Sequence, residues 1–215
     1  REEGGGRAAP MGSSSLATAV AAGALGLANL IVGTSLIPSL LGRGAPFVPT
    51  ASTKIEALFG KKGLLVAGSE RSLLPHGTHP AHLRLVDLGS GDGSLLRAAT
   101  RTAAYGHAAG YEINPWLVAY ARLVSAGRST KEVTHWTSMW EASLDEADVV
   151  LIYGVPPIME GLGKKLAAEL RPGAIVVCNG YELPEHALGH PVAEVFIETS
   201  RWSSDASSNL FCYRR

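Results

Sequence analysis

Charged residues are scarce in this sequence, and neither sign predominates. Only 18% of the 215 residues are Asp, Glu, Lys or Arg, compared with about 25% in an average soluble chain. The 19 basic residues equal the 19 acidic ones, so the chain has no positive excess with which to hold a polyphosphate backbone. We therefore expect no nucleic acid among its partners.

Cysteine and aromatic residues are also few. The two cysteines, Cys178 and Cys212, lie in unrelated apolar segments, and their spacing matches neither a zinc site nor a disulfide scaffold. His76, His79 and His82 lie in a segment with Pro75 and Pro80, which predict a loop, so no metal site is expected. Aromatic residues make up only 7%, which predicts a core built mainly from Ala, Leu and Val.

The first fifth of the chain contains a long uncharged stretch. No charged residue lies between Arg7 and Arg43. Residues 1–15 are rich in Gly and Ser and predict a flexible tail. Within residues 16–42, the segment 17–37 would span about 31 Å as a helix, which matches a bilayer core. We expect a transmembrane helix here; the alternative is a helix buried against the protein's own core or a partner.

The remaining residues divide into a connecting region, 43–82, and a folded domain, 83–215. The first contains a predicted amphipathic helix at Ser52–Phe59. In the second, short apolar runs alternate with helix-length segments, which indicates a mostly parallel α/β sheet. The expected strands are Leu83–Leu88, Ala108–Tyr111, Glu132–Trp136, Val149–Tyr153, Ala174–Cys178, Val192–Glu198 and Leu210–Tyr213, and the expected helices are Ser94–Tyr105, Pro115–Ala126 and Pro157–Leu170. The last two strands have no helix between them and predict an antiparallel pair.

A glycine-rich loop follows the first strand of this domain. Asp87 precedes Gly89, Gly91 and Gly93, and glycines at alternate positions allow a tight turn and a close approach to a ligand. The spacing differs from the dinucleotide pattern G-x-G-x-x-G. Two carboxylates, Asp87 and Asp92, suit a ligand with an ammonium or sulfonium charge. The alternative is a glycine-rich turn with a helix cap.

An acid also follows the second strand. Glu112 stands where Rossmann-type sheets place the carboxylate that accepts ribose hydroxyls, and Ile113 beside it is positioned to lie against an adenine. Asn114 and Pro115 form a helix start, as N-cap and first helical residue. We therefore interpret Asn114, Pro115 and Trp116 as structural, and the two acids and the loop as a nucleoside-cofactor site.

Five segments together resemble a known family. They are PFVPT at 46–50, VDLGSGDG at 86–93, GYEINPWLVAYAR at 110–122, GVPPIM at 154–159 and KKLAAELRPGA at 164–174. In combination the sequence resembles the mitochondrial lysine methyltransferases that modify the ATP synthase c subunit and the adenine nucleotide translocase. These belong to the class I methyltransferase superfamily.

The resemblance implies a Rossmann-like fold and S-adenosyl-L-methionine as cofactor. It implies cofactor contacts from Thr50, Asp87, Gly89, Gly91, Gly93, Glu112, Ile113 and Ser138, and substrate contacts from Gly154, Pro156 and Pro157. No catalytic residue is named, because methyl transfer from a sulfonium mainly requires positioning. The sequence departs from the family after the third strand, where Ser138-Met139-Trp140 replaces Asp-Leu-Trp, and near the acceptor side at 179–184 and 211–214.

The resemblance also implies a function and a location. We expect a protein-lysine N-methyltransferase of the mitochondrial inner membrane, anchored by residues 16–42, whose substrate is a membrane protein such as the ATP synthase c subunit. The basic residues Arg43, Lys54, Lys61 and Lys62 favour a domain that faces the matrix. The alternatives are a structural subunit of a large inner-membrane complex with little or no catalysis, and an enzyme that methylates a small molecule.

Overall fold

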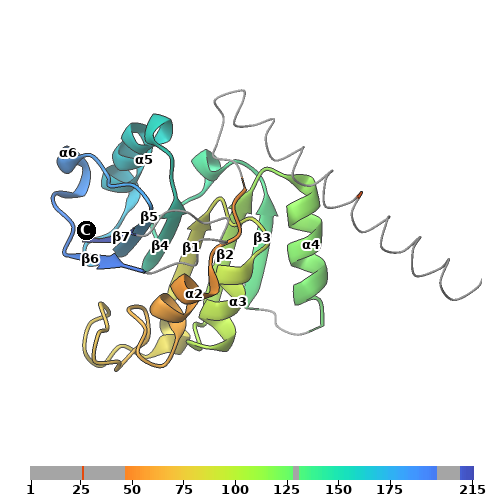
Figure 1. The fold of residues 1–215 in the computed structure, drawn as a ribbon, viewed down its shortest axis with the longest axis horizontal. Coiled ribbons are helices and arrows are strands. Elements are labelled where there is room, and N and C mark those ends of the chain that lie inside the picture. Colours follow the sequence, from red (N-terminus) through yellow and green to blue (C-terminus); the bar gives the residue numbers. More distant parts are fainter. Residues whose placement is uncertain (1–25, 27–46, 128–130, 198–208) are drawn as a thin grey trace, which may run out of the picture.

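One mixed β-sheet forms the centre of the protein. The computed structural model describes residues 26, 47–127, 131–197 and 209–215. Within them, seven strands follow the order β3-β2-β1-β4-β5-β7-β6 (Figure 1). The strands are β1 Arg84–Leu88, β2 His107–Glu112, β3 Glu132–Trp136, β4 Val149–Tyr153, β5 Ile175–Asn179, β6 Ala193–Phe196 and β7 Asn209–Arg214.

The sheet is parallel from β1 to β5 and antiparallel at its C-terminal end. β1 pairs in parallel with β2 and β4, whereas β7 pairs antiparallel with both β5 and β6. This confirms the predicted α/β sheet with an antiparallel C-terminal pair. The predicted strand Val192–Glu198 is shorter in the structure, Ala193–Phe196. The sequence did not predict that β7 would lie between β5 and β6.

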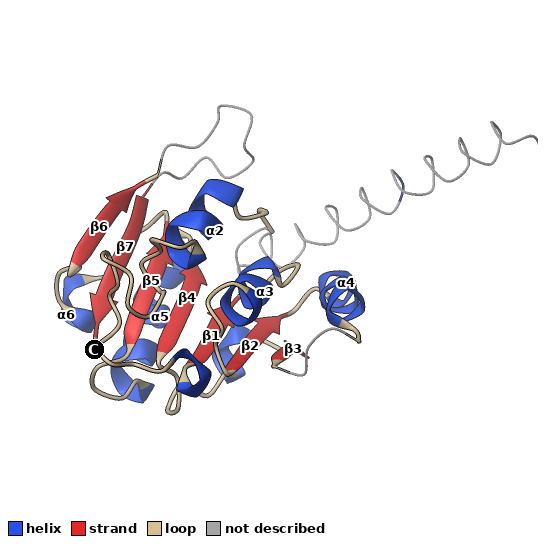
Figure 2. Cartoon of the chain, turned by 90° about the horizontal axis from the view of Figure 1, so that it is seen from below, coloured by secondary structure: helices blue, strands red, loops and turns tan. Residues whose placement is uncertain are grey.

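Helices cover both faces of the sheet (Figure 2). On one face lie α2 Ser52–Phe59, α3 Ser94–Arg101 and α4 Pro115–Ser125, and on the other lie α5 Pro156–Glu169 and α6 Glu185–Leu188. Short 3-10 helices occur at Pro80–His82 and Met139–Glu141. Successive side chains of a strand point to opposite faces, so Leu85 and Leu151 pack in the core under α2 and α3, whereas Val86 and Ile152 pack under α5.

The start of α4 follows from its own sequence. The side chain of Asn114 accepts hydrogen bonds from the backbone N–H groups of Trp116 and Leu117, and Pro115 is the first helical residue. The predicted helix start, with Asn114 as N-cap and Pro115 as first helical residue, is therefore confirmed. This cap fixes the direction in which the chain leaves β2, which also orients the end of β2 where Glu112 lies.

Helix α3 ends earlier than the sequence predicts. The helical pattern extends to Tyr105, but the helix stops at Arg101, and Ala104 has a positive φ of 59°. Tyr105 instead turns into the core. Its ring meets Phe59 edge-on at 6.1 Å, and its hydroxyl donates to the Leu65 carbonyl at 2.9 Å. Tertiary packing of one large side chain thus overrides the helical pattern.

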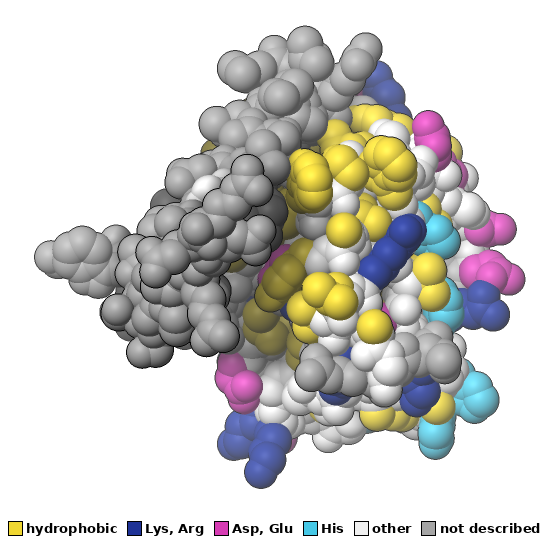
Figure 3. Space-filling model, turned by 90° about the vertical axis from the view of Figure 1, so that its right-hand side faces the viewer, with side chains coloured by type: hydrophobic (Ala, Val, Ile, Leu, Met, Phe, Trp, Pro, Cys, Tyr) yellow, Lys and Arg dark blue, Asp and Glu magenta, His cyan; other side chains and the backbone are white. Residues whose placement is uncertain are grey.

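Helix α4 presents hydrophobic side chains to solvent as well as to the sheet. Leu117, Val118 and Ala121 are buried, whereas Trp116, Tyr120 and Leu123 are exposed. Figure 3, which views this side of the molecule, shows hydrophobic side chains gathered on its surface. The apolar character of α4 therefore extends beyond the stripe that its packing on the sheet requires.

The predicted tail (1–15) and transmembrane segment (16–42) lie outside the described residues, apart from Gly26. Among the residues that the structure does describe, no helix has the length and apolarity needed to cross a bilayer.

Candidate cofactor-binding site

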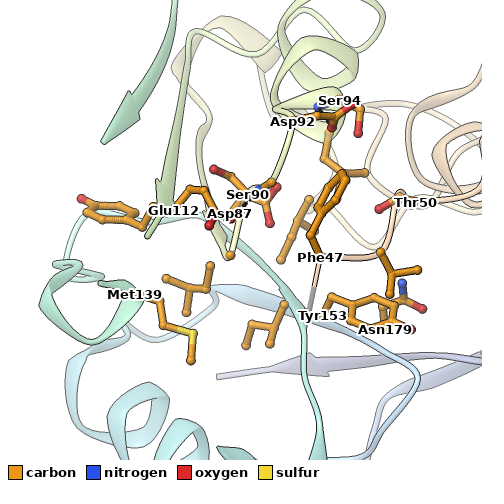
Figure 4. Close-up of a pocket in the computed structure, with 18 of the residues that line it drawn as sticks. Phe47, Thr50, Asp87, Ser90, Asp92, Ser94, Glu112, Met139, Tyr153 and Asn179 are labelled. Carbon is orange, nitrogen blue, oxygen red and sulfur yellow. Dashed lines mark hydrogen bonds between the residues drawn. The ribbon is translucent and has the colours of Figure 1, made fainter. Parts of the chain in front are cut away.

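A pocket opens at the carboxyl ends of the parallel strands, on the face that α2 covers. Asp87 on β1 and Leu151 on β4 are paired in register, and so are Tyr153 on β4 and Asn179 on β5. Residues paired in register, or two apart on one strand, share a face of the sheet. The ends of four strands therefore direct Asp87, Glu112, Tyr153 and Asn179 to the same side (Figure 4).

The glycine loop after β1 has the backbone conformation that its sequence predicts. Gly89, Gly91 and Gly93 have φ values of 85°, 53° and 76°, a left-handed region that side-chain-bearing residues rarely adopt. A Cβ on Gly91 would lie 2.5 Å from the ring of Phe47. The loop therefore needs glycine at Gly91 for two reasons, its backbone angle and the close approach of Phe47.

Glu112 connects the glycine loop to the start of α4. Its Oε2 accepts the Gly91 N–H at 2.9 Å, and its Oε1 accepts the Asn114 N–H at 2.7 Å. The side chain is 8% exposed. Burial raises the pKa of Glu112, and the hydrogen bonds from Asn114 and Gly91 lower it in part. Each carboxylate oxygen has a second lone pair, so Glu112 can still accept hydroxyl donors from a ligand.

The surroundings of Asp87 disfavour the ionised form of its carboxyl group. Asp87 is 3% exposed, and burial, with repulsion from Glu112 and then Asp92, raises its pKa to about 8. Like charges near a buried carboxyl disfavour its ionised form, and a cation beside it favours that form. The arrangement therefore favours a ligand that brings positive charge to Asp87.

Asp92 has a structural role in addition to its place in the pocket wall. Its Oδ1 accepts the Ser94 N–H at 2.9 Å, and its Oδ2 lies 3.5 Å from the Arg97 guanidinium. The N-cap of α3 is Gly93, which makes no side-chain capping hydrogen bond, so the predicted cap by Asp92 or Ser94 is wrong; Asp92 instead bonds the first helical residue from the position before the N-cap. Because Arg97 partly compensates Asp92, Asp87 and Glu112 are the acids of the lining for which the described residues show no ion pair.

The structure brings most of the predicted cofactor residues together. The pocket lining includes Thr50, Asp87, Gly89, Gly91, Glu112, Ile113 and Ser138. Gly93 is not in the lining; it is the N-cap of α3. The predicted substrate residues lie just beyond the wall: Gly154 follows β4, and Pro156 and Pro157 form the first turn of α5. Their neighbours Tyr153 and Ile158 do line the pocket.

Ser138 lies in the loop after β3. Its Oγ accepts the Trp140 N–H at 3.4 Å and caps the 3-10 helix Met139–Glu141. Met139 lines the pocket beside it. Figure 4 places Met139 and Glu112 toward one end of the pocket and Thr50 and Asn179 toward the other.

Lys54, Tyr153 and Asn179 also line the pocket, and none of them was predicted from the sequence as a cofactor or substrate contact. Lys54 is fully buried on α2, and its Nζ donates to Asn179 Oδ1 at 2.7 Å. The sequence did contain one signal that Lys54 faces inward: it stands four residues before Leu58, on the same side of the helix. No sequence pattern links Lys54 to Asn179, which lies 125 residues away.

The fold is shared with a solved enzyme. The RNA methyltransferase of Salinibacter ruber, in complex with S-adenosyl-L-homocysteine, superimposes with a TM-score of 0.60 at 26% identity, over 78% of this chain and 93% of that one. A sheet of this order, with a glycine loop after β1 and an acid at the end of β2, defines a class I S-adenosylmethionine-dependent methyltransferase.

The relatives define the family more narrowly. The family described as "ANTKMT methyltransferase domain" matches residues 87–188. The ATP synthase c-subunit lysine N-methyltransferase of Rattus norvegicus is 33% identical over 90% of this chain and 81% of its own length. The adenine nucleotide translocase lysine N-methyltransferase of Mus musculus is 41% identical over 57% of this chain and 53% of its own. The chain belongs to this family of protein-lysine N-methyltransferases.

The residues present fit S-adenosylmethionine. This cofactor carries an ammonium and a sulfonium, and Asp87, Asp92 and Glu112 supply acids to the lining. Ser90 Oγ is buried and has no hydrogen-bond partner among the described residues, so it is available to a polar ligand group. Among the described residues, the site thus contains acids, an unsatisfied hydroxyl and glycines that admit close contact.

Proposed function

We propose that this chain methylates a lysine ε-amino group of a mitochondrial membrane protein, with the ATP synthase c subunit as the first candidate. The extent of the similarity carries the proposal. The relative from Rattus norvegicus, whose name specifies the c subunit, matches 90% of this chain. The relative from Mus musculus, whose name specifies the adenine nucleotide translocase, matches a shorter part. The c subunit is therefore tested first and the translocase second.

The chemistry requires a neutral amine held in line with the methyl group. The cofactor supplies that methyl group on a sulfonium, and the protein must position the amine. A lysine with a pKa of about 10.4 loses its proton at a cost of about 3–4 kcal/mol near pH 7.5–8. Leu151, Ile152 and Ile158 make the pocket wall at the end of β4 and the start of α5 apolar. An apolar wall disfavours the ammonium form of the acceptor lysine and so lowers the cost of its deprotonation.

The ends of β4 and β5 form the proposed acceptor side. We propose that Gly154, Pro156 and Pro157 form its outer rim and Tyr153 its inner wall. A Cβ at Gly154 would lie 2.2 Å from Met159 Sδ, so a side chain at this position would have to displace the Met159 side chain. Enzymes that methylate nucleobase amino groups usually carry Asn or Asp, two prolines and an aromatic residue here. Val155 and Ile158 stand at the polar and aromatic positions, which disfavours a nucleobase.

A location at the mitochondrial inner membrane belongs to the same proposal. Residues 16–42 are proposed as the anchor and residues 43–82 as the connection to the catalytic domain, 83–215, which would face the matrix. Lysines of membrane proteins that lie near the bilayer surface would then be within reach. Full-length protein in the carbonate-washed membrane pellet, with residues 44–215 in the supernatant, would support the anchor; equal partition of the two would contradict it.

Transfer of labelled methyl groups tests the function. Wild-type protein and the Glu112→Ala variant are incubated with labelled S-adenosylmethionine and, separately, the purified c subunit, the translocase and RNA. We expect label on a lysine of the c subunit, identified by mass spectrometry, and none with Glu112→Ala. Label confined to RNA would favour the activity in the name of the Salinibacter ruber neighbour. Cofactor binding without transfer to any acceptor would favour a structural role in a larger complex.

A further inference from the structure

Lys54 is a buried basic residue in the wall of the cofactor pocket. It lies on α2, its relative exposure is 0%, and its Nζ donates to Asn179 Oδ1 at 2.7 Å. Moving an ammonium out of water is costly, so buried lysines are kept where another group stabilises the charge. Asn179 Oδ1 is one such group, and the place of Lys54 in the pocket lining brings its ammonium next to a bound ligand.

The charges of the pocket lining are divided between two sides. Asp87, Asp92 and Glu112 lie on β1, the glycine loop and β2, whereas Lys54 and Asn179 lie on α2 and β5. Among the described residues of the lining, Lys54 is the only basic one. The pocket thus offers anionic groups on one side and a cationic group on the other.

The sheet order assigns the parts of the cofactor to these two sides. The ends of β3 and β2 carry Ser138, Ile113 and Glu112, the residues assigned to adenine and ribose. β1 comes next, and then β4 and β5 with Tyr153 and Asn179. Neighbouring strands are about 4.8 Å apart, so a ligand with its ribose at β2 extends its other end toward β4 and β5. That end of S-adenosylmethionine is the methionine moiety.

We propose that Lys54 binds the carboxylate of the methionine moiety, and that Asn179 holds the Lys54 ammonium in position. The methionine moiety carries an ammonium and a carboxylate, which match the acids of the glycine loop and Lys54 respectively. Thr50, four residues before Lys54, also lines the pocket and offers a hydroxyl on the same side. This assignment rests on the cofactor site and not on the identity of the acceptor protein.

Paired ligands that differ only in the carboxylate test the proposal. Calorimetry on the full chain compares S-adenosylhomocysteine with its decarboxylated form, S-adenosyl-3-thiopropylamine. In the wild type, the carboxylate-bearing ligand is expected to bind about 10- to 100-fold more tightly, as for a charge-assisted hydrogen bond. In Lys54→Gln, this preference is expected to fall to within about threefold of unity, while the decarboxylated ligand binds nearly as in the wild type.

Two results would overturn the assignment: equal affinity of the wild type for both ligands, or a Lys54→Gln variant that weakens both ligands equally. A second variant, Asn179→Ala, leaves the Lys54 charge in place. It is expected to reduce the preference by about three- to fivefold, and an unchanged preference would contradict the role of the pair. If Lys54→Gln does not fold by circular dichroism, the wild type and Asn179→Ala decide the question. None of these measurements needs an acceptor, so failure of the proposed substrate would leave them intact.

Discussion

Glu112 Oε2 accepts the Gly91 N–H at 2.9 Å, so the acid that ends β2 holds the glycine loop that follows β1. Through its other oxygen, the same carboxylate holds Asn114, the N-cap of α4. Glu112 thus maintains the shape of the pocket, in addition to the contact with ribose that the family resemblance implies.

Replacement of Glu112 by Ala is expected to reduce both stability and cofactor binding. Two hydrogen bonds from buried backbone N–H groups to a carboxylate are lost, at about 1–3 kcal/mol each in the free energy of unfolding. Calorimetric affinity for S-adenosylhomocysteine should fall at least about tenfold. The control is Glu146→Ala, which removes an exposed pair with Arg84 and should change stability by less than about 1 kcal/mol. Wild-type affinity in Glu112→Ala would contradict this role.

From the raised pKa of Asp87 we predict that the ligand-free protein loses stability as the pH rises. The Asp87 carboxyl has a pKa of about 8 in the folded protein and 3.8 as the reference value. Between these values the folded state holds a proton that the unfolded state has lost, so the free energy of unfolding decreases with rising pH. Urea unfolding at pH 5, 7 and 9 should show this slope in the wild type and a smaller one in Asp87→Asn. Parallel curves for the two proteins would contradict it.

We also predict that the Asp87 carboxyl releases a proton when a cationic ligand binds. A cation beside Asp87 lowers its pKa, so binding of S-adenosylmethionine near pH 7 should release about one proton. Calorimetry in two buffers of different ionisation enthalpy measures this number. Asp87→Asn should release fewer protons and bind more weakly, and identical proton release in both proteins would assign the effect to another group.

Comparison of Gly91→Ala with a control glycine is expected to separate two effects: backbone strain, which lowers stability, and the clash with Phe47, which weakens cofactor binding. The matched control is Gly173→Ala, because Gly173 also has a positive φ, of 88°, but nothing lies within 4 Å of the position that a Cβ would take there. Both variants should lose about 1 kcal/mol of stability from the backbone conformation. Only Gly91→Ala should weaken cofactor binding by about tenfold or more, because the Phe47 ring must move. Equal affinities in the two variants would show that Phe47 can move at little cost.

Two leucines on helices test which face of each helix supports the fold. Leu166 on α5 is 0% exposed, whereas Leu123 on α4 is 74% exposed. Leu166→Ala should cost about 2–5 kcal/mol in the free energy of unfolding, and Leu123→Ala less than about 0.5 kcal/mol. Chemical denaturation measures both, and since the substitution is the same, helix propensity contributes equally. Similar losses would mean that the α4 surface is packed against another part of the chain.

Local patterns were sufficient to predict most of the fold. The helix Ser52–Phe59 and the strand Val149–Tyr153 were predicted with the bounds that the structure gives them, because apolar runs and turn residues define them. The cap at Asn114 is also a local effect. The end of α3 was predicted wrongly, since Tyr105 leaves the helix for a contact with Phe59 that lies 46 positions earlier in the chain.

The acidic half of the site was predictable and the basic half was not. Asp87 and Glu112 each lie near the carboxyl end of a strand that is followed by a recognisable turn, so a short sequence window contains their signal. Lys54 and Asn179 acquire their relationship only when α2 packs over the end of β5. In the sequence, Lys54 belongs to the charged region that follows the predicted anchor, and a lysine beside a membrane segment usually lies at the surface.

The place of β7 in the sheet affects how the protein can be made. β7 is synthesised after β1–β6, yet it lies between β5 and β6 and pairs with both. Until Asn209–Arg214 leave the ribosome, β5 presents an open edge of five residues that are all buried in the finished fold, and such edges pair readily with other chains. The nascent domain is therefore prone to aggregation until its final strand can pair. A premature stop before residue 209 would remove a strand from within the sheet and not from its edge. β6 would lose its pairing with β7, and we expect cellular quality control to degrade the shortened chain.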